Sequence, residues 1–405
     1  MSGFATGSLQ LTRDLNRAAV LRLIASSGPI ARSAIARRLG LSPATVTSLT
    51  RELSEQGLLR VAERAPSRGG RPALLLEIVG AAATAFGVKV APDRLVGVRI
   101  NLDADVLERF EEPFDTAAPD APGRIATTLA RWLEASKERA PLLGVGLGVP
   151  GIANRDGVVN APMLGWKRLD LAGLVSKEIG LPVLVDNDVN TLAIAERLYG
   201  RGRDADDFVT VTLGPGIGLG IVAGGDIHRG YGGGAGEFGH VNVVEDGAAC
   251  RCGLRGCLET VAADRALVAR ARRERVIANR SGIERLRQVA ETDDRAKAIF
   301  ADAGAVLGRA VAGIVNVLSP QLVLVSGEGV QAWTYLGEAF EEALRRHVFP
   351  PLAGVGVEVD PWDDAKWAVG AAALVLRSTF TAPLDQNPPE SSIRARFPRQ
   401  AEALA

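Results

Sequence analysis

The sequence has few cysteines, no net charge and no long apolar run. It contains three cysteines among 405 residues, an odd number that argues against a disulfide framework and favours a reducing, cytoplasmic compartment. No uninterrupted apolar run is long enough to cross a bilayer, and the N-terminus shows no signal-peptide pattern. A secreted disulfide scaffold and a membrane-bound protein are therefore not expected.

The zero net charge hides an uneven distribution. Lysine is absent from the first 78 residues, which contain eleven arginines and five acidic residues, so this segment carries a formal charge of +6 and the remainder carries −6. A length of 405 residues corresponds to two or three domains of ordinary size. The asymmetry indicates a nucleic-acid-binding end joined to a neutral or acidic body.

The basic end has the pattern of three helices. Residues 11–26 carry an apolar stripe at helical spacing, which a Gly-Pro pair ends. A short second helix is expected over 32–39, again followed by glycine. The third begins with Ser42 as N-cap and Pro43 at the first helical position, and continues to about residue 56. This order of helix, short helix, tight turn and helix is typical of helix-turn-helix domains.

One face of the third helix is predicted to contact DNA. Apolar residues and one threonine recur at i, i+3, i+4 and i+7 and face the core, namely Val46, Leu49, Thr50 and Leu53. The opposite face carries short side chains, mostly hydroxyls, and one guanidinium, near the helix end that enters the major groove: Ser42, Ala44, Thr45, Thr47, Ser48 and Arg51. The alternative is that the three helices form a solvated basic bundle.

A hairpin follows the third helix. Residues 58–64 and 72–78 have the composition of strands, and the segment between them, APSRGGRP, is rich in turn residues. Arg64, Arg68 and Arg71 lie on or beside this turn, where guanidinium groups meet phosphates or a minor groove. The pattern predicts a winged helix-turn-helix domain over residues 1–80, with double-stranded DNA as its partner.

Beyond residue 80 the pattern alternates between strands and helices. A hairpin is expected over 85–90 and 95–100, and four further apolar runs end in glycines or acids, at 142–151, 181–188, 208–222 and 322–329. Helices are expected over 122–138, 189–200 and 295–318. This alternation predicts an α/β body with largely buried sheets over residues 81–380. The polar, proline-rich segment 381–405 is predicted to be a disordered tail.

All the cysteines lie in one short stretch of the body. Cys250, Cys252 and Cys257 follow His240 within HVNVVEDGAACRCGLRGCLE, with glycines at the turns. Three thiolates and one imidazole make a closed tetrahedral set, which is the ligand inventory of a structural zinc site. The alternative is a group of inert buried cysteines beside a core histidine. We expect structural zinc because free cysteines are usually scattered.

Three motifs of the body carry a resemblance to a known family. These are LVDNDVN at 184–190, GEFGH at 236–240 and CRCGLRGCLET at 250–260, together with GGRP at the end of the wing. The chain resembles the ROK family, and within it the transcriptional repressors of the xylose and N-acetylglucosamine type. The resemblance implies an actin- and hexokinase-like body of two α/β lobes around a cleft, a zinc site at the cysteines and histidine above, and a homodimer.

The resemblance also implies a sugar site. The family's Asn-Asp pair matches Asn187 and Asp188, the family's kinase base falling at Asp188, and its two acids match Glu237 and Glu259. His240 would bind zinc through one ring nitrogen and a sugar hydroxyl through the other. A backbone contact is expected at Gly151. Carboxylates and amides suit a sugar because each hydroxyl is both donor and acceptor.

The phosphate-binding motifs of the family's kinases do not match this chain. Where those kinases resemble D-x-G-G-T-K, the chain has Lys89 in place of the acid and Pro92 in place of a backbone N–H donor. In the second loop, similar to L-G-T-G-I-G, Pro215 replaces the threonine. Met163 stands where many relatives have asparagine, which leaves the identity of the sugar open.

The sequence therefore predicts a sugar-responsive DNA-binding repressor, with no catalytic residues. Two winged domains of a dimer would span a palindromic operator, and sugar binding would favour a state that no longer fits the DNA. The first alternative is a ROK-type sugar kinase with a DNA-binding head, which the retained Asp188 favours. The second is a dimerisation module without a ligand, which the retained acids argue against.

Overall fold

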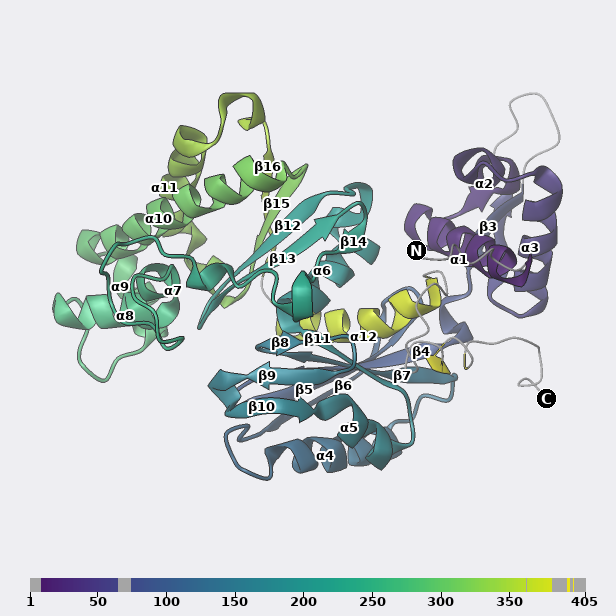
Figure 1. Cartoon of the computed structure of the whole chain (residues 1–405), viewed down its shortest axis with the longest axis horizontal. Coiled ribbons are helices and arrows are strands. Elements are labelled where there is room, and N and C mark those ends of the chain that lie inside the picture. The colour runs from purple at the N-terminus through teal and green to yellow at the C-terminus, as the bar shows by residue number, and fades with distance from the viewer. Residues whose placement is uncertain (1–8, 65–73, 362, 381–391, 394–395, 397–405) are drawn as a thin grey trace, which may run out of the picture. The chain divides into compact units, whose positions relative to one another are not determined.

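The computed structural model describes residues 9–64, 74–361, 363–380, 392–393 and 396, and the chain divides into two compact units (Figure 1). Unit 1 comprises Met1–Arg203 and Ala365–Ala405, and unit 2 comprises Asp204–Asp364. Unit 1 is therefore built from two stretches of chain that enclose unit 2 in the sequence. Each unit has its own five-stranded sheet.

The first part of unit 1 is a winged helix-turn-helix, as predicted. Its helices are α1 (Leu9–Ser27), α2 (Arg32–Leu39) and α3 (Pro43–Glu55), and its small antiparallel sheet has the order β1-β3-β2, with β1 (Ile30–Ala31), β2 (Leu59–Arg64) and β3 (Leu74–Ile78). Gly40 ends α2 in the left-handed conformation, and α3 starts three residues later, at Pro43. The turn of the wing, residues 65–73, lies outside the described residues.

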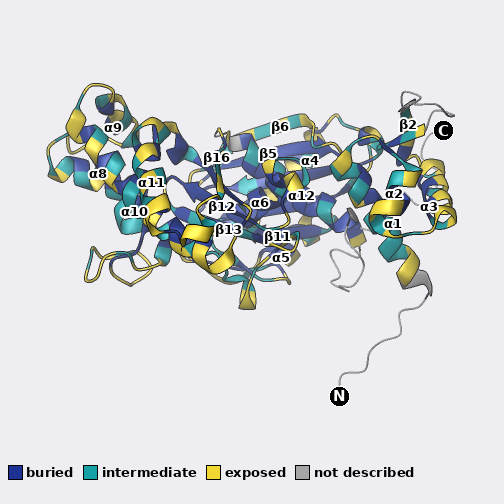
Figure 2. Cartoon of the chain, turned by 90° about the horizontal axis from the view of Figure 1, so that it is seen from above, coloured by how far each residue is buried: buried dark blue, intermediate teal, exposed yellow. Residues whose placement is uncertain are grey.

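The core of the helix-turn-helix forms where the spacing predicted it. Val46, Leu49, Thr50 and Leu53 are all buried on α3. The helix α3 contacts both α1 and α2, and the outward turns of α3 are exposed (Figure 2). The periodic pattern therefore fixes which face of α3 is available to a partner.

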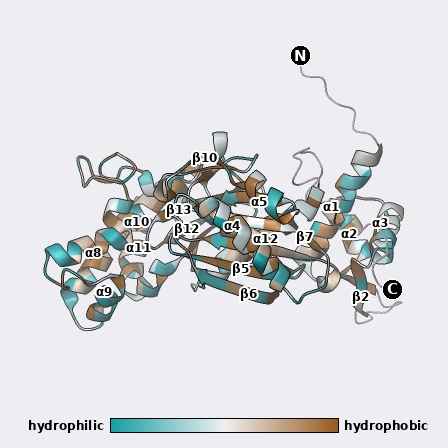
Figure 3. Cartoon of the chain, turned by 90° about the horizontal axis from the view of Figure 1, so that it is seen from below, coloured by the Kyte–Doolittle hydropathy of each residue, from teal (hydrophilic) through white to brown (hydrophobic). Residues whose placement is uncertain are grey.

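The larger sheet of unit 1 has the order β11-β7-β4-β5-β6. Its strands are β4 (Thr84–Val90), β5 (Arg94–Asn101), β6 (Val106–Pro113), β7 (Leu142–Val149) and β11 (Val183–Asn187). The predicted hairpin is the antiparallel pair β4–β5, whereas β4, β7 and β11 are parallel. The outer strand β6 alternates exposed and half-buried residues and is more hydrophilic than β5 (Figure 3). The carboxyl ends of β4, β7 and β11 consequently share one edge.

Four helices and a second small sheet complete this part of unit 1. The helices are α4 (Ala121–Ala135), α5 (Leu171–Ile179), α6 (Asp188–Leu198) and α12 (Asp364–Phe380), and the sheet has the order β10-β9-β8, with β8 (Ile152–Ala153), β9 (Val158–Ala161) and β10 (Trp166–Asp170). Glycines allow α12 to approach closely. A Cβ at Gly146 would lie 1.8 Å from the Ala371 carbonyl oxygen, and one at Gly370 would lie 2.7 Å from the backbone of Thr191 in α6. The helix α12 is thus pressed against both the sheet and α6.

The segment after α12 departs from the predicted disordered tail at two described residues. Ile393 is fully buried, and its side chain lies over Gly144 of β7. Arg396 Nε donates to the Leu142 carbonyl oxygen at 3.1 Å. Burial of the Ile393 side chain is favourable, and Gly144 leaves space for it because glycine has no side chain. Residues 381–391 lie outside the described residues.

Unit 2 has the sheet order β14-β13-β12-β15-β16. Its strands are β12 (Phe208–Leu213), β13 (Ile217–Ala223), β14 (Asp226–Ile227), β15 (Leu322–Ser326) and β16 (Gly356–Val359), and its helices are α7 (Glu259–Ala262), α8 (Asp264–Arg273), α9 (Ile283–Ala290), α10 (Asp294–Leu318) and α11 (Trp333–His347). The apolar run 208–222 is the hairpin β12–β13, because Gly214, Pro215 and Gly216 form its turn.

The helix α10 is the one element among the described residues that is long and apolar enough to cross a membrane. Half of its most apolar window is buried, and residues such as Phe300, Leu307 and Val311 belong to the core of unit 2. Close packing against α11 explains its apolar composition, since an added Cβ at Gly304 would lie 2.3 Å from the Leu336 carbonyl oxygen. The buried face is the feature expected of a core helix.

Candidate functional site

The predicted start of the recognition helix α3 is confirmed. The Ser42 hydroxyl accepts a hydrogen bond from the Thr45 backbone N–H at 3.0 Å, and Pro43 occupies the first turn. The Thr47 hydroxyl donates to the Pro43 carbonyl oxygen at 2.8 Å. This cap satisfies a backbone donor at the helix end that the sequence predicts to enter a groove.

The six residues expected to face DNA lie on the outer side of α3. Ser42, Ala44, Thr47, Ser48 and Arg51 are exposed and Thr45 is half-buried. The Arg51 guanidinium is 3.8 Å from the Glu55 carboxylate, and both side chains are at least 70% exposed. Such a pair contributes little to stability. Arg51 can therefore change partner without an appreciable cost to the fold.

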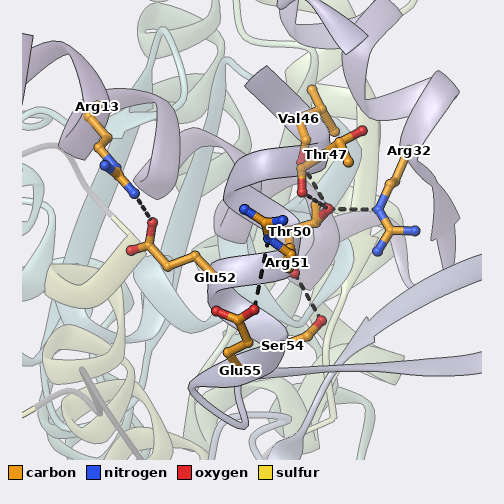
Figure 4. A network of polar contacts seen from close by, with 9 residues as sticks. All are labelled: Arg13, Arg32, Val46, Thr47, Thr50, Arg51, Glu52, Ser54 and Glu55. Atoms are coloured by element: carbon orange, nitrogen blue, oxygen red, sulfur yellow. Dashed lines mark hydrogen bonds and ion pairs between the residues drawn. The ribbon is translucent and has the colours of Figure 1, made fainter. Parts of the chain in front are cut away.

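Several arginines of the basic end stabilise the fold instead (Figure 4). Arg32 Nε donates to the Thr50 hydroxyl at 2.7 Å, and that hydroxyl donates to the Val46 carbonyl oxygen at 2.8 Å. Arg13 of α1 pairs with Glu52 of α3 (Figure 4). These contacts fix α3 against α1 and α2. The sequence showed the positive charge of this segment but not which of its arginines make contacts within the domain. Of the wing arginines, Arg64 ends β2, its side chain lies outside the described residues, and Arg68 and Arg71 fall in the same undescribed segment.

The four predicted metal ligands form one cluster in unit 2. One donor atom from each of His240, Cys250, Cys252 and Cys257 lies within 4.8 Å of all the others. His240 Nδ1 is 3.7 Å from Cys250 Sγ, and Cys252 Sγ is 3.7 Å from Cys257 Sγ. Burial, reinforced by the neighbouring thiols, raises the pKa of Cys257 to about 12. A cation is needed to hold such a set as thiolates at neutral pH.

The backbone of this loop folds tightly around the cysteines. Cys250 N–H donates to the Leu254 carbonyl oxygen at 2.8 Å, and Asn242 pairs with Cys257 in an isolated bridge. Gly256 has φ of +69°, and a Cβ there would lie 1.8 Å from the Val244 carbonyl oxygen. Glycine is required at this position, so the turn glycines of the motif have a structural reason. The cluster could hold a metal ion in a closed tetrahedral set.

Two further predicted residues lie beside the cluster. The Nε2 atom of His240, opposite the nitrogen that faces the cysteines, is 3.9 Å from the Glu237 carboxylate. Glu259 begins α7, and its carboxylate accepts from the Ile217 backbone N–H at 3.0 Å. A Cβ at Gly239 would lie 3.0 Å from the same carboxylate oxygen, so GEFGH and Glu259 are in contact. The structure thus brings Glu237, His240 and Glu259 together within unit 2.

The other three predicted residues meet in unit 1. Asn187 ends β11 and caps α6, and its side-chain oxygen accepts from the N–H groups of Val189 and Asn190 at 2.9 and 3.2 Å. Its Nδ2 donates to the Gly151 carbonyl oxygen at 3.0 Å. Asp188 follows at the first position of α6. This is the strand end where ligands meet an open α/β sheet.

Lys89 lies on β4 of the same sheet, which is parallel to β11 and separated from it by β7. It is in register with Gly148, and a Cβ at Gly148 would lie 3.5 Å from Asp188 Cα. The Lys89 ammonium lies 4.2 Å from the ring centroid of Trp367 in α12. Burial raises the pKa of the Asp188 carboxyl, and the Lys89 charge lowers it in part. A lysine next to this carboxylate is the reverse of the acid that a magnesium-nucleotide site requires.

Sequence reasoning did not anticipate Trp367. It is 7% exposed and shares a small apolar cluster with Val189 and Leu192 of α6. The only indication of Trp367 in the sequence was a single aromatic residue in the run AKWAVGAAA, whose composition is typical of a helix of small residues. Its place beside Asp188 depends on a contact between segments about 180 residues apart, which no local pattern reveals.

Comparison with known proteins agrees with both regions. Residues 87–378 match the ROK family, which is most of the chain, and residues 14–64 match the MarR family. The chain belongs to the ROK family. Its fold is a MarR-like winged helix-turn-helix followed by the family's actin- and hexokinase-like body.

Named relatives with this architecture are repressors. The chain is 29% identical to the putative xylose repressor of Caldicellulosiruptor sp. (strain Rt8B.4) over 401 residues, covering 93% of this chain and 99% of that protein. It is 28% identical to the DNA-binding transcriptional dual regulator NagC of Escherichia coli (strain K12) over 393 residues, covering 94% and 97%.

Solved structures include both regulators and kinases. A ROK family transcriptional regulator, described as a homologue of the E. coli MLC protein, superposes with a TM-score of 0.80 at 26% identity, covering 96% of this chain and 99% of that one. A ROK family glucokinase from Streptomyces griseus, in complex with glucose and AMPPNP, superposes with a TM-score of 0.63 at 27% identity, covering 72% of this chain and 98% of that one. The regulator covers the winged domain as well as the body.

Proposed function

We propose that this ROK protein is a sugar-responsive DNA-binding repressor of carbohydrate metabolism genes. The observation that carries the proposal is the carboxyl edge of the unit 1 sheet, where Asn187 and Asp188 form a capped polar turn after β11, while β4, two strands away, carries Lys89. A sugar needs directional acceptors, which this edge keeps, whereas a magnesium-bound triphosphate needs acids and backbone donors, which Lys89 and Pro92 remove. Relatives of nearly full length, one named a putative xylose repressor and one a DNA-binding transcriptional dual regulator, support the same function.

The proposed sugar-binding residues are Gly151, Asn187 and Asp188, which meet within unit 1, and Glu237, His240 and Glu259, which meet within unit 2. Asp188 accepts hydrogen bonds from sugar hydroxyls, and Asn187, already held by Gly151, orients the turn. Glu237 stands beside the histidine nitrogen that does not face the cysteines. Each of these residues thus has a lone pair or a donor for a hydroxyl. The sugars D-xylose, N-acetyl-D-glucosamine and D-glucose are the probes suggested by the named relatives.

The metal is structural zinc, held by His240, Cys250, Cys252 and Cys257. Four protein donors leave no open position, so the ion supplies rigidity rather than a reactive water. When bound, zinc keeps the loop from Glu237 to Glu259 in one conformation. The protein's own residues then present Glu237 and Glu259 to the effector. The chain acts in the cytoplasm, where the three cysteines stay reduced.

DNA recognition belongs to the outer face of α3 and to the wing. Ser42, Ala44, Thr45, Thr47, Ser48 and Arg51 meet the major groove, and Arg64, Arg68 and Arg71 meet phosphates. A homodimer spans two half-sites about one helical turn, or a multiple of it, apart. Effector binding shifts the dimer to a state that fits this spacing poorly, with a coupling of about 1–3 kcal/mol.

The direct test is operator binding in the presence of sugars. Fluorescence anisotropy with the DNA upstream of the protein's own coding region should show binding that is tighter than to random DNA and that weakens steeply with salt. One of the three probe sugars should reduce operator affinity by about 5- to 150-fold. Equal affinity for operator and random DNA would disprove the repressor assignment.

A ROK sugar kinase carrying a DNA-binding head is the second candidate. It is favoured by Asp188, which stands at the end of β11, where a hydroxyl of a bound sugar would meet a general base. Incubation with magnesium, ATP and each probe sugar decides between the two. The repressor forms no sugar phosphate above background, whereas a kinase turns over at about 1 per second or faster and loses this activity in Asp188→Asn.

A further inference from the structure

The helix α6 connects the candidate effector turn with a second, unassigned contact at its other end. Asn187 and Asp188 form its N-terminus, and Tyr199 is its C-cap. The Tyr199 hydroxyl donates to the Leu102 carbonyl oxygen at 3.3 Å, across 97 residues of sequence. Burial raises the pKa of this phenol, so the hydroxyl stays protonated and remains a donor at neutral pH. An 11-residue helix spans about 16 Å, which separates the two ends clearly.

Leu102 is in turn bonded to the base of the winged domain. It is 1% exposed, and its backbone N–H donates to the Gly80 carbonyl oxygen at 3.0 Å. Gly80 directly follows Val79, whose N–H donates to the Leu58 carbonyl oxygen at 2.9 Å. The N–H of Leu58 donates to the Leu53 carbonyl oxygen in the last turn of α3 at 2.9 Å. A short series of hydrogen bonds therefore joins the end of α6 to the recognition helix.

Close contacts hold the series at Gly80, in its middle, and at its α6 end. At Gly80 a Cβ would lie 2.0 Å from an Asp103 carboxylate oxygen, so the chain is closely packed where it leaves the wing. At the end of α6 the Glu196 carboxylate accepts from the Arg201 N–H at 2.9 Å. Along its length α6 is backed by α12 through Gly370. A displacement at Asp188 would consequently move α6 as a rigid body rather than bend it.

We infer that Tyr199 is a positioning residue that couples effector binding at Asp188 to the orientation of the winged domain. The inference rests on the proposed function. The Tyr199 hydroxyl bond is present in one of the two states of the protein and is broken or lengthened in the other. Removal of this hydrogen bond reduces the coupling free energy between sugar binding and operator binding. It does so without changing a residue that contacts the sugar or the DNA. Neither the sugar nor the DNA contacts the phenol.

The test is a thermodynamic cycle on the full-length dimer with Tyr199→Phe, which deletes the hydroxyl and keeps the ring. Operator affinity is measured by anisotropy with and without the probe sugar that acts on the wild type, chosen from D-xylose, N-acetyl-D-glucosamine and D-glucose. Sugar affinity is measured separately by calorimetry. Tyr335→Phe is the matched control, because this half-buried tyrosine stacks on Phe300 within unit 2, with ring centroids 5.8 Å apart, and takes no part in the series of hydrogen bonds.

The coupling factor, which is the ratio of operator affinities without and with sugar, should fall by about three- to tenfold in Tyr199→Phe, the value of one hydrogen bond. The two separate affinities should each stay within about twofold of wild type, and Tyr335→Phe should retain the full coupling factor. An unchanged coupling factor in Tyr199→Phe would overturn the inference, as would an equal loss in Tyr335→Phe. A variant that loses operator or sugar binding outright would also overturn it, because the hydroxyl would then serve one site alone. If no probe sugar changes operator binding by the wild type, the proposed function fails, which is a different result.

Discussion

Two turns at the same edge of the unit 1 sheet carry side chains of different chemistry. The turn after β11 carries Asn187 and Asp188, caps a helix and donates to Gly151. The turn after β4 follows Lys89 and contains Pro92, whose ring removes a backbone donor. The strands are parallel and separated by β7 alone. We propose that this edge keeps hydroxyl recognition and has lost phosphate handling, because the two tasks depend on different turns.

The comparison of the two turns also indicates what Lys89 does to Asp188. A cation at this position opposes the burial that raises the pKa of Asp188. In a nucleotide site a bound metal would supply positive charge, whereas here a side chain that lies over Trp367 supplies it. The Lys89 ammonium thus compensates part of the negative charge of Asp188. We propose that sugar binding at the turn after β11 therefore does not require a nucleotide.

The largest expected effect comes from removing the proposed zinc from the cluster of His240, Cys250, Cys252 and Cys257 in unit 2. Metal analysis should find one zinc per chain, and Cys252→Ser should lose it together with sugar response, because structural zinc sites are worth about 10–16 kcal/mol of apparent binding energy. His347→Gln changes a histidine outside the cluster and should keep both zinc and response. A metal-free protein with full sugar response would separate the cluster from effector binding.

Substitution of the retained acid tests the sugar side of the comparison directly. Asp188→Asn keeps the shape of the side chain but loses a charged acceptor, so sugar affinity should fall by about 1.5–3 kcal/mol by calorimetry. Operator binding without sugar should stay near the wild-type value. The exposed Asp156→Asn in the turn before β9 is the control. Normal sugar affinity in Asp188→Asn would show that the two turns do not differ in the proposed way.

A variant in the recognition helix should have the opposite phenotype. Arg51→Ala should reduce discrimination between operator and random DNA by about 1–3 kcal/mol if the guanidinium reads a guanine, and should leave sugar affinity unchanged. Arg71→Ala should weaken binding to both DNAs more evenly, as expected for a phosphate contact. If the specificity ratio of Arg51→Ala matches the wild type, the recognition surface lies elsewhere on the winged domain.

The smallest effect should appear in the pH dependence of sugar affinity. Asp188 is the stronger hydrogen-bond acceptor as a carboxylate, so sugar affinity should be highest above its pKa in the folded protein and should fall as pH falls through that value. Burial raises this pKa, and Lys89 lowers it in part. Lys89→Met should therefore move the loss of affinity to higher pH, whereas the exposed Lys177→Met should not. An unmoved profile in Lys89→Met would show that the lysine does not act on Asp188.

Local patterns predicted the elements that depend on local chemistry. The N-cap Ser42, the buried stripe of α3 and the cluster of His240 with three cysteines all follow from short spacings, and the structure has each of them. The family resemblance supplied the fold of the body. Contacts between distant segments were not predictable, because nothing near Trp367 or Tyr199 indicates its partner. The apolar run 208–222 did not show by itself that it turns to form the hairpin β12–β13.

The discontinuity of unit 1 has a consequence for synthesis of the protein. The winged domain is made first, but α12, which lies against Gly87 and Gly146 of the sheet, follows the whole of unit 2. At about 5–20 residues per second the ribosome needs on the order of ten to thirty seconds to make the intervening segment. During this interval the apolar face that α12 covers is exposed. A transcript cut short after unit 2 would accordingly yield a chain that chaperones and proteases remove, rather than an operator-binding protein that no sugar can release.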